Sequence, residues 1–125
     1  MELADLSYKI RGAIYTVYKE LGPGLFESVY EAALMYELES IGIKAQSQMS
    51  LPAFYKGIKL DLGFRLDILV ENQVIIEIKS VESLHNVHKK QLLNYLKLSG
   101  KKLGFLVNFN VDLLVDKESL IRIIN

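Results

Sequence analysis

The chain has 125 residues, half of them apolar, which is typical of one globular domain, residues 1–125, with a core of its own. It contains no cysteine, which excludes a disulfide framework, a thiolate metal site and a cysteine nucleophile, and makes the cytoplasm the expected compartment. The formal net charge of zero, from 15 basic and 15 acidic residues, argues against a uniformly basic nucleic-acid-binding protein.

The charges are nevertheless uneven along the chain. Residues 1–42 carry 3 basic and 7 acidic residues, residues 43–83 carry 5 of each, and residues 84–125 carry 7 basic and 3 acidic residues. No uninterrupted apolar run exceeds five residues, whereas a membrane span needs ~20, so we expect no membrane segment. The zero total therefore conceals a basic last third that could hold a polyanion.

The spacing of apolar residues predicts the elements in chain order. Helical spacing over Leu3–Leu21 and Phe26–Ile41 predicts two helices, joined at Gly22-Pro23-Gly24. The same helical spacing over Leu84–Ser99 predicts a third helix. The expected strands are 43–55, Ile58–Val70, Gln73–Ser80 after a turn at Glu71-Asn72, Leu103–Asn108 and, as edge strands or their connection, Val111–Val115 and Leu120–Ile124. The order α-α-β-β-β-α-β-β predicts an α/β (α+β) fold with a mixed central β-sheet flanked by helices.

The two central strands, 58–70 and 73–80, carry charged residues on one face. Side chains alternate along a strand, so the even positions form a wholly apolar face, and Arg65, Asp67, Glu77 and Lys79 share the other face with Leu69 and Ile75. The even positions are Phe64, Leu66, Ile68, Val70, Val74, Ile76 and Ile78. If Val70 pairs with Val74, Asp67 lies opposite Glu77, with Cβ atoms about 4.5 to 5.5 Å apart.

Two interpretations of this charged face remain open. Two carboxylates beside an ammonium group are what a hard divalent cation and an activated water require. Alternatively, the four charged side chains form cross-strand ion pairs on a solvated sheet face, each of little energetic value. The predicted helices are enough to cover both faces of the sheet, which would place the charges in a cleft and favours the first interpretation.

The predicted helix 84–99 adds polar and basic groups. Its sheet-facing stripe includes His88 and Gln91, which would point toward the carboxylates, although a histidine in such a row is more often structural. Residues 84–104 contain five lysines and no acid, and the lysines either contact a phosphate backbone or only favour a helix C-terminus. They are Lys89, Lys90, Lys97, Lys101 and Lys102.

The motif Gly24-x-x-Glu27-x-x-Tyr30 resembles the signature of the GxxExxY proteins, a family of the PD-(D/E)xK nuclease-like superfamily. The resemblance extends over nearly the whole chain, through Tyr55-Lys56-Gly57, Gly63 to Asp67, Glu77-Ile78-Lys79, His88, Gln91 to Leu96, and Gly104 to Asn110. Leu66 stands where the superfamily's name has a proline.

This resemblance implies a restriction-endonuclease-like core and a metal site. Asp67 and Glu77 would be ligands of Mg²⁺ or Mn²⁺, with the backbone carbonyl of Ile78 and the carboxylate of Glu27 as further ligands. Lys79 would lie near the attacking water, and Gln91 would line the site. Further candidate site residues are His88, Tyr30 and Arg65, while from the residues alone Tyr30 is a core residue and Glu27 a partner of the helix dipole.

The expected function is that of a Mg²⁺-dependent nuclease that hydrolyses phosphodiester bonds in DNA by metal-activated water. The alternative is a non-cleaving nucleic-acid- or partner-binding module, or an accessory subunit, that keeps the fold. No base-reading motif separates DNA from RNA, and cleavage of both strands of a duplex would favour a homodimer.

Overall fold

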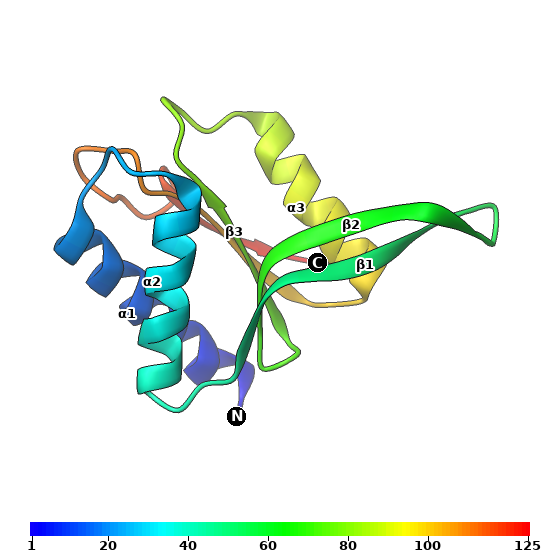
Figure 1. Cartoon of the computed structure of the whole chain (residues 1–125), viewed down its shortest axis with the longest axis horizontal. Coiled ribbons are helices and arrows are strands. Elements are labelled where there is room, and N and C mark those ends of the chain that lie inside the picture. The colour runs from blue at the N-terminus through cyan, green and yellow to red at the C-terminus, as the bar shows by residue number, and fades with distance from the viewer.

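The computed structural model describes residues 1–125 and contains three helices and five strands (Figure 1). In chain order these are α1 (Leu3–Leu21), α2 (Glu27–Ser40), β1 (Ala45–Tyr55), β2 (Ile58–Val70), β3 (Val74–Lys79), α3 (Asn86–Ser99), β4 (Leu103–Asn108) and β5 (Leu120–Ile124). The predicted element order is confirmed. None of the helices combines the length and apolar character needed to cross a membrane.

The five strands form one mixed sheet in the order β1-β2-β3-β4-β5. All neighbouring strands are antiparallel except β3 and β4, which are parallel because α3 carries the chain back across the sheet between them. The predicted turn between β2 and β3 is confirmed: Glu71 and Asn72 have positive φ angles of 50° and 55°, which is typical of a tight hairpin turn.

The helices cover both faces of the sheet, as expected. α1 and α2 pack on one face and bury a cluster of 20 residues with Ile68, Val70, Ile76 and Ile78 of the sheet. α3 packs on the other face and buries a smaller cluster of 7 residues. Gly104 of β4 permits this close approach, since a Cβ atom there would lie 2.9 Å from the side chain of Leu92 on α3.

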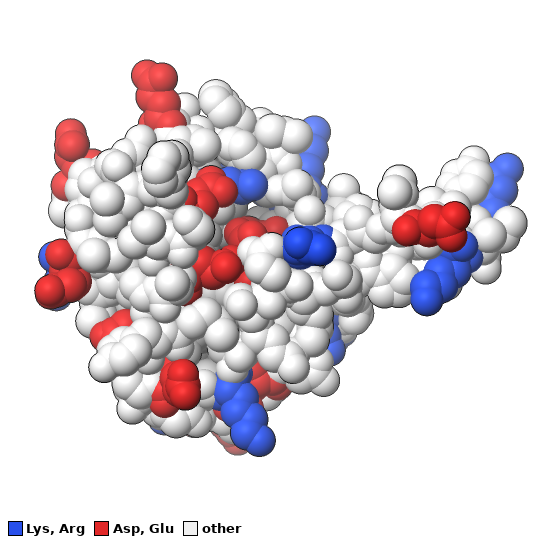
Figure 2. Space-filling view, in the orientation of Figure 1, with Lys and Arg blue, Asp and Glu red and all other residues white.

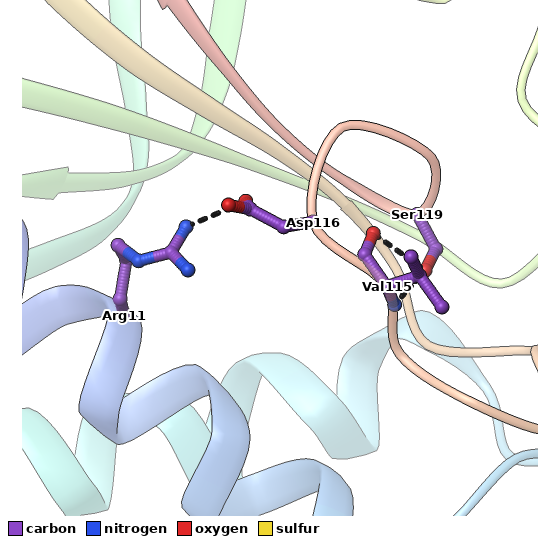
Figure 3. A network of polar contacts seen from close by, with 4 residues as sticks. All are labelled: Arg11, Val115, Asp116 and Ser119. Atoms are coloured by element: carbon purple, nitrogen blue, oxygen red, sulfur yellow. Dashed lines mark hydrogen bonds and ion pairs between the residues drawn. The ribbon is translucent and has the colours of Figure 1, made fainter.

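The segment Val111–Val115, expected as an edge strand or its connection, forms no strand and connects β4 to β5. It is held by α1 and by its own turn, so its backbone groups do not join the sheet. The Tyr18 hydroxyl donates to the carbonyl of Val111, and Arg11 of α1 forms an ion pair with Asp116 at 2.8 Å (Figure 3). Ser119 Oγ accepts from the N–H of Val115 at 2.8 Å and closes the turn (Figure 3).

The predicted apolar faces are wrong at three residues. The helical spacing over Phe26–Ile41 predicts that Val29 faces the core, but Val29 is exposed and the following residue, Tyr30, takes its place. On β2, Phe64 and Leu66 do not share a face with Ile68 but pack against α3 with Tyr95. The reason is an irregularity at Asp67, where pairing with β1 is interrupted opposite Gln48, which has a φ of 55°. The strand turns over at this point.

On the N-terminal side of Asp67 in β2, this strand and the part of β1 paired with it leave the rest of the sheet. They project as a two-stranded arm, at the right of Figure 1. β2 pairs with β3 only through Ile68, Leu69 and Val70, whereas its pairing with β1 continues to Ile58. The carboxylate pair predicted from the sequence therefore lies at the root of this arm.

Candidate active site

Asp67 and Glu77 bind each other's strand through their side chains. The pairing of Val70 with Val74 is confirmed, and the ladder ends one step before Asp67 and Glu77. There the Asp67 N–H donates to Glu77 Oε2 at 2.9 Å, and the Ile78 N–H donates to Asp67 Oδ2 at 2.7 Å. Carboxylate oxygens thus replace backbone carbonyls as acceptors, which separates the strands and holds the two acidic side chains together.

Glu77 is buried, Asp67 is half-buried, and neither has an ion-pair partner. Glu77 is only 4% exposed, and burial, followed by the charge of Asp67, raises the pKa of Glu77 to about 8. The only ion pair in the structure joins Arg11 to Asp116. The alternative of cross-strand ion pairs with Arg65 and Lys79 is therefore wrong for this structure. Ionisation of both carboxyl groups would leave negative charge that no ion pair of the protein compensates.

Lys79 approaches this pair and is oriented by α3. Its Nζ lies 3.4 Å from Gln91 Oε1, and its charge favours the ionised form of Glu77 without an ion pair. Gln91 lies one turn before Tyr95, whose pKa is raised by burial and then by the charges of Glu77 and Asp67. The predicted sheet-facing stripe of α3 therefore does border the carboxylates. Arg65 is exposed, two residues before Asp67 at the root of the arm.

Glu27 lies at the edge of the same site, at the start of α2. Its Oε2 accepts from the N–H of Ser80 at 3.0 Å, directly after Lys79, and Ser80 Oγ donates to the carbonyl of Leu25 at 2.6 Å. The first turn of α2 is thereby tied to the end of β3. One carboxylate oxygen of Glu27 therefore accepts a backbone hydrogen bond, and the other accepts none.

Tyr30 supports the site from the core. Its side chain is fully buried and its ring stacks on Phe109, with centroids 4.4 Å apart and planes 9° from parallel. Its hydroxyl donates to the carbonyl of Gly22 at 2.6 Å and accepts from the N–H of Leu25. The motif tyrosine therefore fixes the glycine-rich corner that begins α2, and it does not contact the carboxylates.

His88 caps the start of α3. Its Nδ1 accepts from the N–H of His85 at 3.0 Å, the reciprocal contact of a capping box. Burial, followed by the charges of Lys79 and His85, lowers the pKa of His88. His88 is therefore a structural residue whose ring lies close enough to Lys79 to be affected by its charge.

Sequence reasoning missed Glu31 and Gln48. Glu31 is four residues after Glu27 on α2, and Gln48 Nε2 donates to Glu31 Oε1 at 2.7 Å. Burial, followed by the charge of Asp67, raises the pKa of Glu31. The spacing of four residues between two glutamates on one helix was the available signal, because such residues share a face. In Figure 2, acidic side chains gather in a hollow over α2 and the strands, where the arm joins the body.

Three of the five lysines, Lys90, Lys97 and Lys101, do not lie beside the carboxylates. Lys90 and Lys97 are seven residues apart on α3, on the side opposite the buried Leu92 and Leu96. Lys101 Nζ contacts Asn72 Oδ1 in the β2–β3 turn, at the other end of the strands from Asp67 and Glu77. Their predicted contact with nucleic acid stays a prediction, and it would require a substrate that extends over the outside of α3.

The residues fit a divalent cation in charge and donor type, although no three histidine or acidic residues form a ready ligand cluster. Asp67, half-buried, and Glu77, buried, supply two adjacent carboxyl groups without an ion-pair partner, and hard oxygen donors are what Mg²⁺ and Mn²⁺ accept. The metal contacts of Ile78 and Glu27 stay predictions.

The fold and this paired-carboxylate site define a nuclease-like protein. The sequence profile of the PD-(D/E)XK nuclease superfamily matches residues 4–123, and the chain therefore belongs to this superfamily. Its mixed five-stranded sheet and element order are those of the restriction-endonuclease-like fold. No curated protein and no solved structure matches the chain. Membership of the GxxExxY family stays a prediction that the profile does not test.

Proposed function

We propose that this protein is a divalent-metal-dependent nuclease that hydrolyses phosphodiester bonds in DNA, with Asp67 and Glu77 as its metal ligands. The observation that carries the proposal is the pair of adjacent carboxyl groups, with Glu77 buried and Asp67 half-buried, which has no ion-pair partner. Superfamily membership supports the same reaction class. When bound, Mg²⁺ or Mn²⁺ would polarise the scissile phosphate and lower the pKa of the attacking water.

The protein's own groups prepare the site for that ion. The N–H groups of Asp67 and Ile78 each fix one carboxylate oxygen, so the remaining oxygens are held in place without a search over rotamers. Lys79, whose ammonium group is oriented by Gln91, can donate a hydrogen bond to the attacking water or to a phosphate oxygen. Its positive charge attracts the phosphate, which the negative charges of Asp67 and Glu77 would repel. Glu27 holds the backbone after β3 and would close the site from α2.

The direct test is cleavage of linear and circular DNA by the purified protein with Mg²⁺, with Mn²⁺ and with EDTA. We expect cleavage only with a divalent ion, and a loss of at least 100-fold in Asp67→Asn, Glu77→Gln and Lys79→Ala, since each removes a group that acts on the reacting atoms. Glu118→Gln, an exposed glutamate in the β4–β5 connection, is the matched control and should cleave like wild type.

Calorimetric titration with Mn²⁺ tests the ligand assignment independently of cleavage. Wild type should bind the ion, and Glu77→Gln should lose most of this affinity. A protein that cuts neither DNA nor RNA, and in which Asp67→Ala binds metal as well as wild type, would refute the proposal. Absence of any metal binding would favour a non-cleaving module with the same fold.

A further inference from the structure

The projecting arm of β1 and β2 is the part of the molecule that the proposed site does not use. We define the arm as residues 45–65; residues 45–47 pair with the part of β2 that joins β3, and the hairpin beyond them continues without β3. The inner half of the arm packs on α3 through Met49, Leu51 and Phe64. The outer half stands away from the body as a two-stranded ribbon (Figure 1).

The arm is basic, whereas the rest of the chain is acidic. Three basic residues, Lys56, Lys59 and Arg65, and one acidic residue, Asp61, lie within residues 45–65. The remaining residues contain 12 basic and 14 acidic side chains, so the arm has a formal charge of +2 and the remainder −2. Figure 2 shows basic side chains at the root and in the outer part of the arm, with acidic ones between them.

Near its tip the arm also exposes large apolar side chains. Phe54, Tyr55, Ile58 and Leu62 are 55%, 62%, 65% and 77% exposed, more than a surface without a partner normally shows in one place. They flank Lys56 and Lys59, and the Lys56 ammonium group lies 5.5 Å from the centre of the Tyr55 ring. This alternation of cationic and apolar side chains matches the chemistry of a nucleic acid. The lysines would contact the phosphates, and the apolar side chains would contact base faces and methyl groups.

The shape of the arm fits a groove of duplex DNA. A two-stranded ribbon is one of the two elements that the major groove of B-DNA admits. At ~3.3 Å per residue, Lys59 lies roughly 26 Å and the first residue of β2, Ile58, roughly 30 Å along the strand from Asp67, which is close to one helical turn of DNA. A duplex with its scissile phosphate at the carboxylates could therefore also contact the tip of the arm.

We propose that this arm is a DNA-binding ribbon that holds duplex DNA about one helical turn from the carboxylate site. This inference rests on the proposed function, because it assigns the acidic body to chemistry and the basic arm to substrate binding. A second copy of the chain is a poorer occupant: two arms of charge +2 repel each other, and Pro52 interrupts hydrogen bonding along the outer edge of β1.

The test compares two pairs of lysine substitutions that change the charge equally. Lys56→Gln with Lys59→Gln neutralises the arm, and Lys9→Gln with Lys19→Gln neutralises two exposed lysines of α1, on the far side of the body (Figure 1). Both are made in an Asp67→Asn background, so that binding of a 20-base-pair duplex can be measured with Mg²⁺ present and cleavage blocked. Fluorescence anisotropy gives the dissociation constant from 50 to 300 mM salt.

We expect the arm pair to weaken binding about 10- to 100-fold at 0.1 M salt and to lower the slope of log K against log salt by about 2. The α1 pair should leave both quantities unchanged. Equal behaviour of the two pairs would overturn the proposal. A six-base-pair duplex, roughly 20 Å long, is too short to reach from the carboxylates to the tip of the arm. The Asp67→Asn variant should therefore bind this duplex with the same affinity whether or not Lys56 and Lys59 are replaced.

A second measurement keeps the inference separate from the proposed reaction. The chain has no cysteine, so Lys56→Cys provides a single labelling site at the tip, and a fluorophore there should respond to the long duplex and not to the short one. Hydrolysis of a small phosphodiester, bis(p-nitrophenyl) phosphate, should be equal in wild type and in a Lys56→Gln/Lys59→Gln variant that keeps Asp67. Absence of hydrolysis in both would refute the nuclease proposal alone, whereas unchanged DNA binding by the arm pair would refute the arm proposal alone.

Discussion

The buried carboxyl group of Glu77 predicts that the metal-free protein loses stability as the pH rises. The pKa of Glu77 is raised from 4.5 to about 8 by burial and by the charge of Asp67. Between these values the folded state binds a proton that the unfolded state has released, so the free energy of unfolding falls with increasing pH. At about 1.4 kcal/mol for each pH unit, the loss amounts to at most about 5 kcal/mol, comparable to the whole stability of a small domain.

Glu77→Gln removes this dependence. Glutamine resembles the protonated glutamic acid, because it keeps an acceptor for the Asp67 N–H and adds a donor toward the Asp67 carboxylate. We therefore expect wild type and Glu77→Gln to be about equally stable near pH 5. Near pH 8 the variant should be more stable by several kcal/mol, and the difference should develop between these two values.

Urea denaturation followed by circular dichroism, in EDTA from pH 5 to pH 9, measures this difference directly. Other titrating groups, including the two histidines, cancel in the comparison of the two proteins. Glu118→Gln should parallel wild type throughout. Saturating Mg²⁺ should stabilise wild type at pH 8 and leave Glu77→Gln unchanged. Parallel pH profiles of wild type and Glu77→Gln in EDTA would refute the claim that this carboxylate is buried without a counter-ion.

Three further substitutions test the packing that holds the site. Gly104→Val would press against Leu92 and push α3 from the sheet, which we expect to cost about 1–3 kcal/mol in thermal or urea denaturation. Asn108→Ala removes the buried amide that bonds both the N–H and the carbonyl of Val81, after β3, with an expected loss of about 2 kcal/mol and a fall in any metal affinity. Gly63→Ala would place its Cβ atom against a backbone carbonyl of β1, so we expect a misaligned arm, measurable as altered amide chemical shifts confined to residues 45–65.

The pairing of β2 with β3 was predictable because the turn and the apolar residues on either side of it determine which residues lie opposite each other. A turn at Glu71 and Asn72 and unbroken apolar residues on both sides allow only one pairing that buries them, and this pairing brings Asp67 opposite Glu77. The helices were predictable for the same reason, since their apolar spacing is set by the core that they cover. Local periodicity therefore accounts for the elements and for the centre of the site.

The arm and the outer site depend on contacts that no local pattern contains. Strict alternation along β2 failed at Asp67, because a carboxylate takes over a backbone hydrogen bond there and the strand turns over. The role of Glu31 depends on Gln48, 17 residues away on another element. The lysines near α3 are clustered in sequence, but this does not bring them together in space. Helix geometry directs Lys90 and Lys97 away from the carboxylates.

The hydrogen bonds of the site span very different distances along the chain. Asp67 and Glu77 are joined across 10 residues, whereas Glu27 meets Ser80 across 53. Closing a short hairpin costs less chain entropy than docking a remote helix. The carboxylate pair is therefore set by local chain closure, whereas the position of Glu27 depends on the burial of Tyr30, Leu34 and Leu38 of α2 in the core.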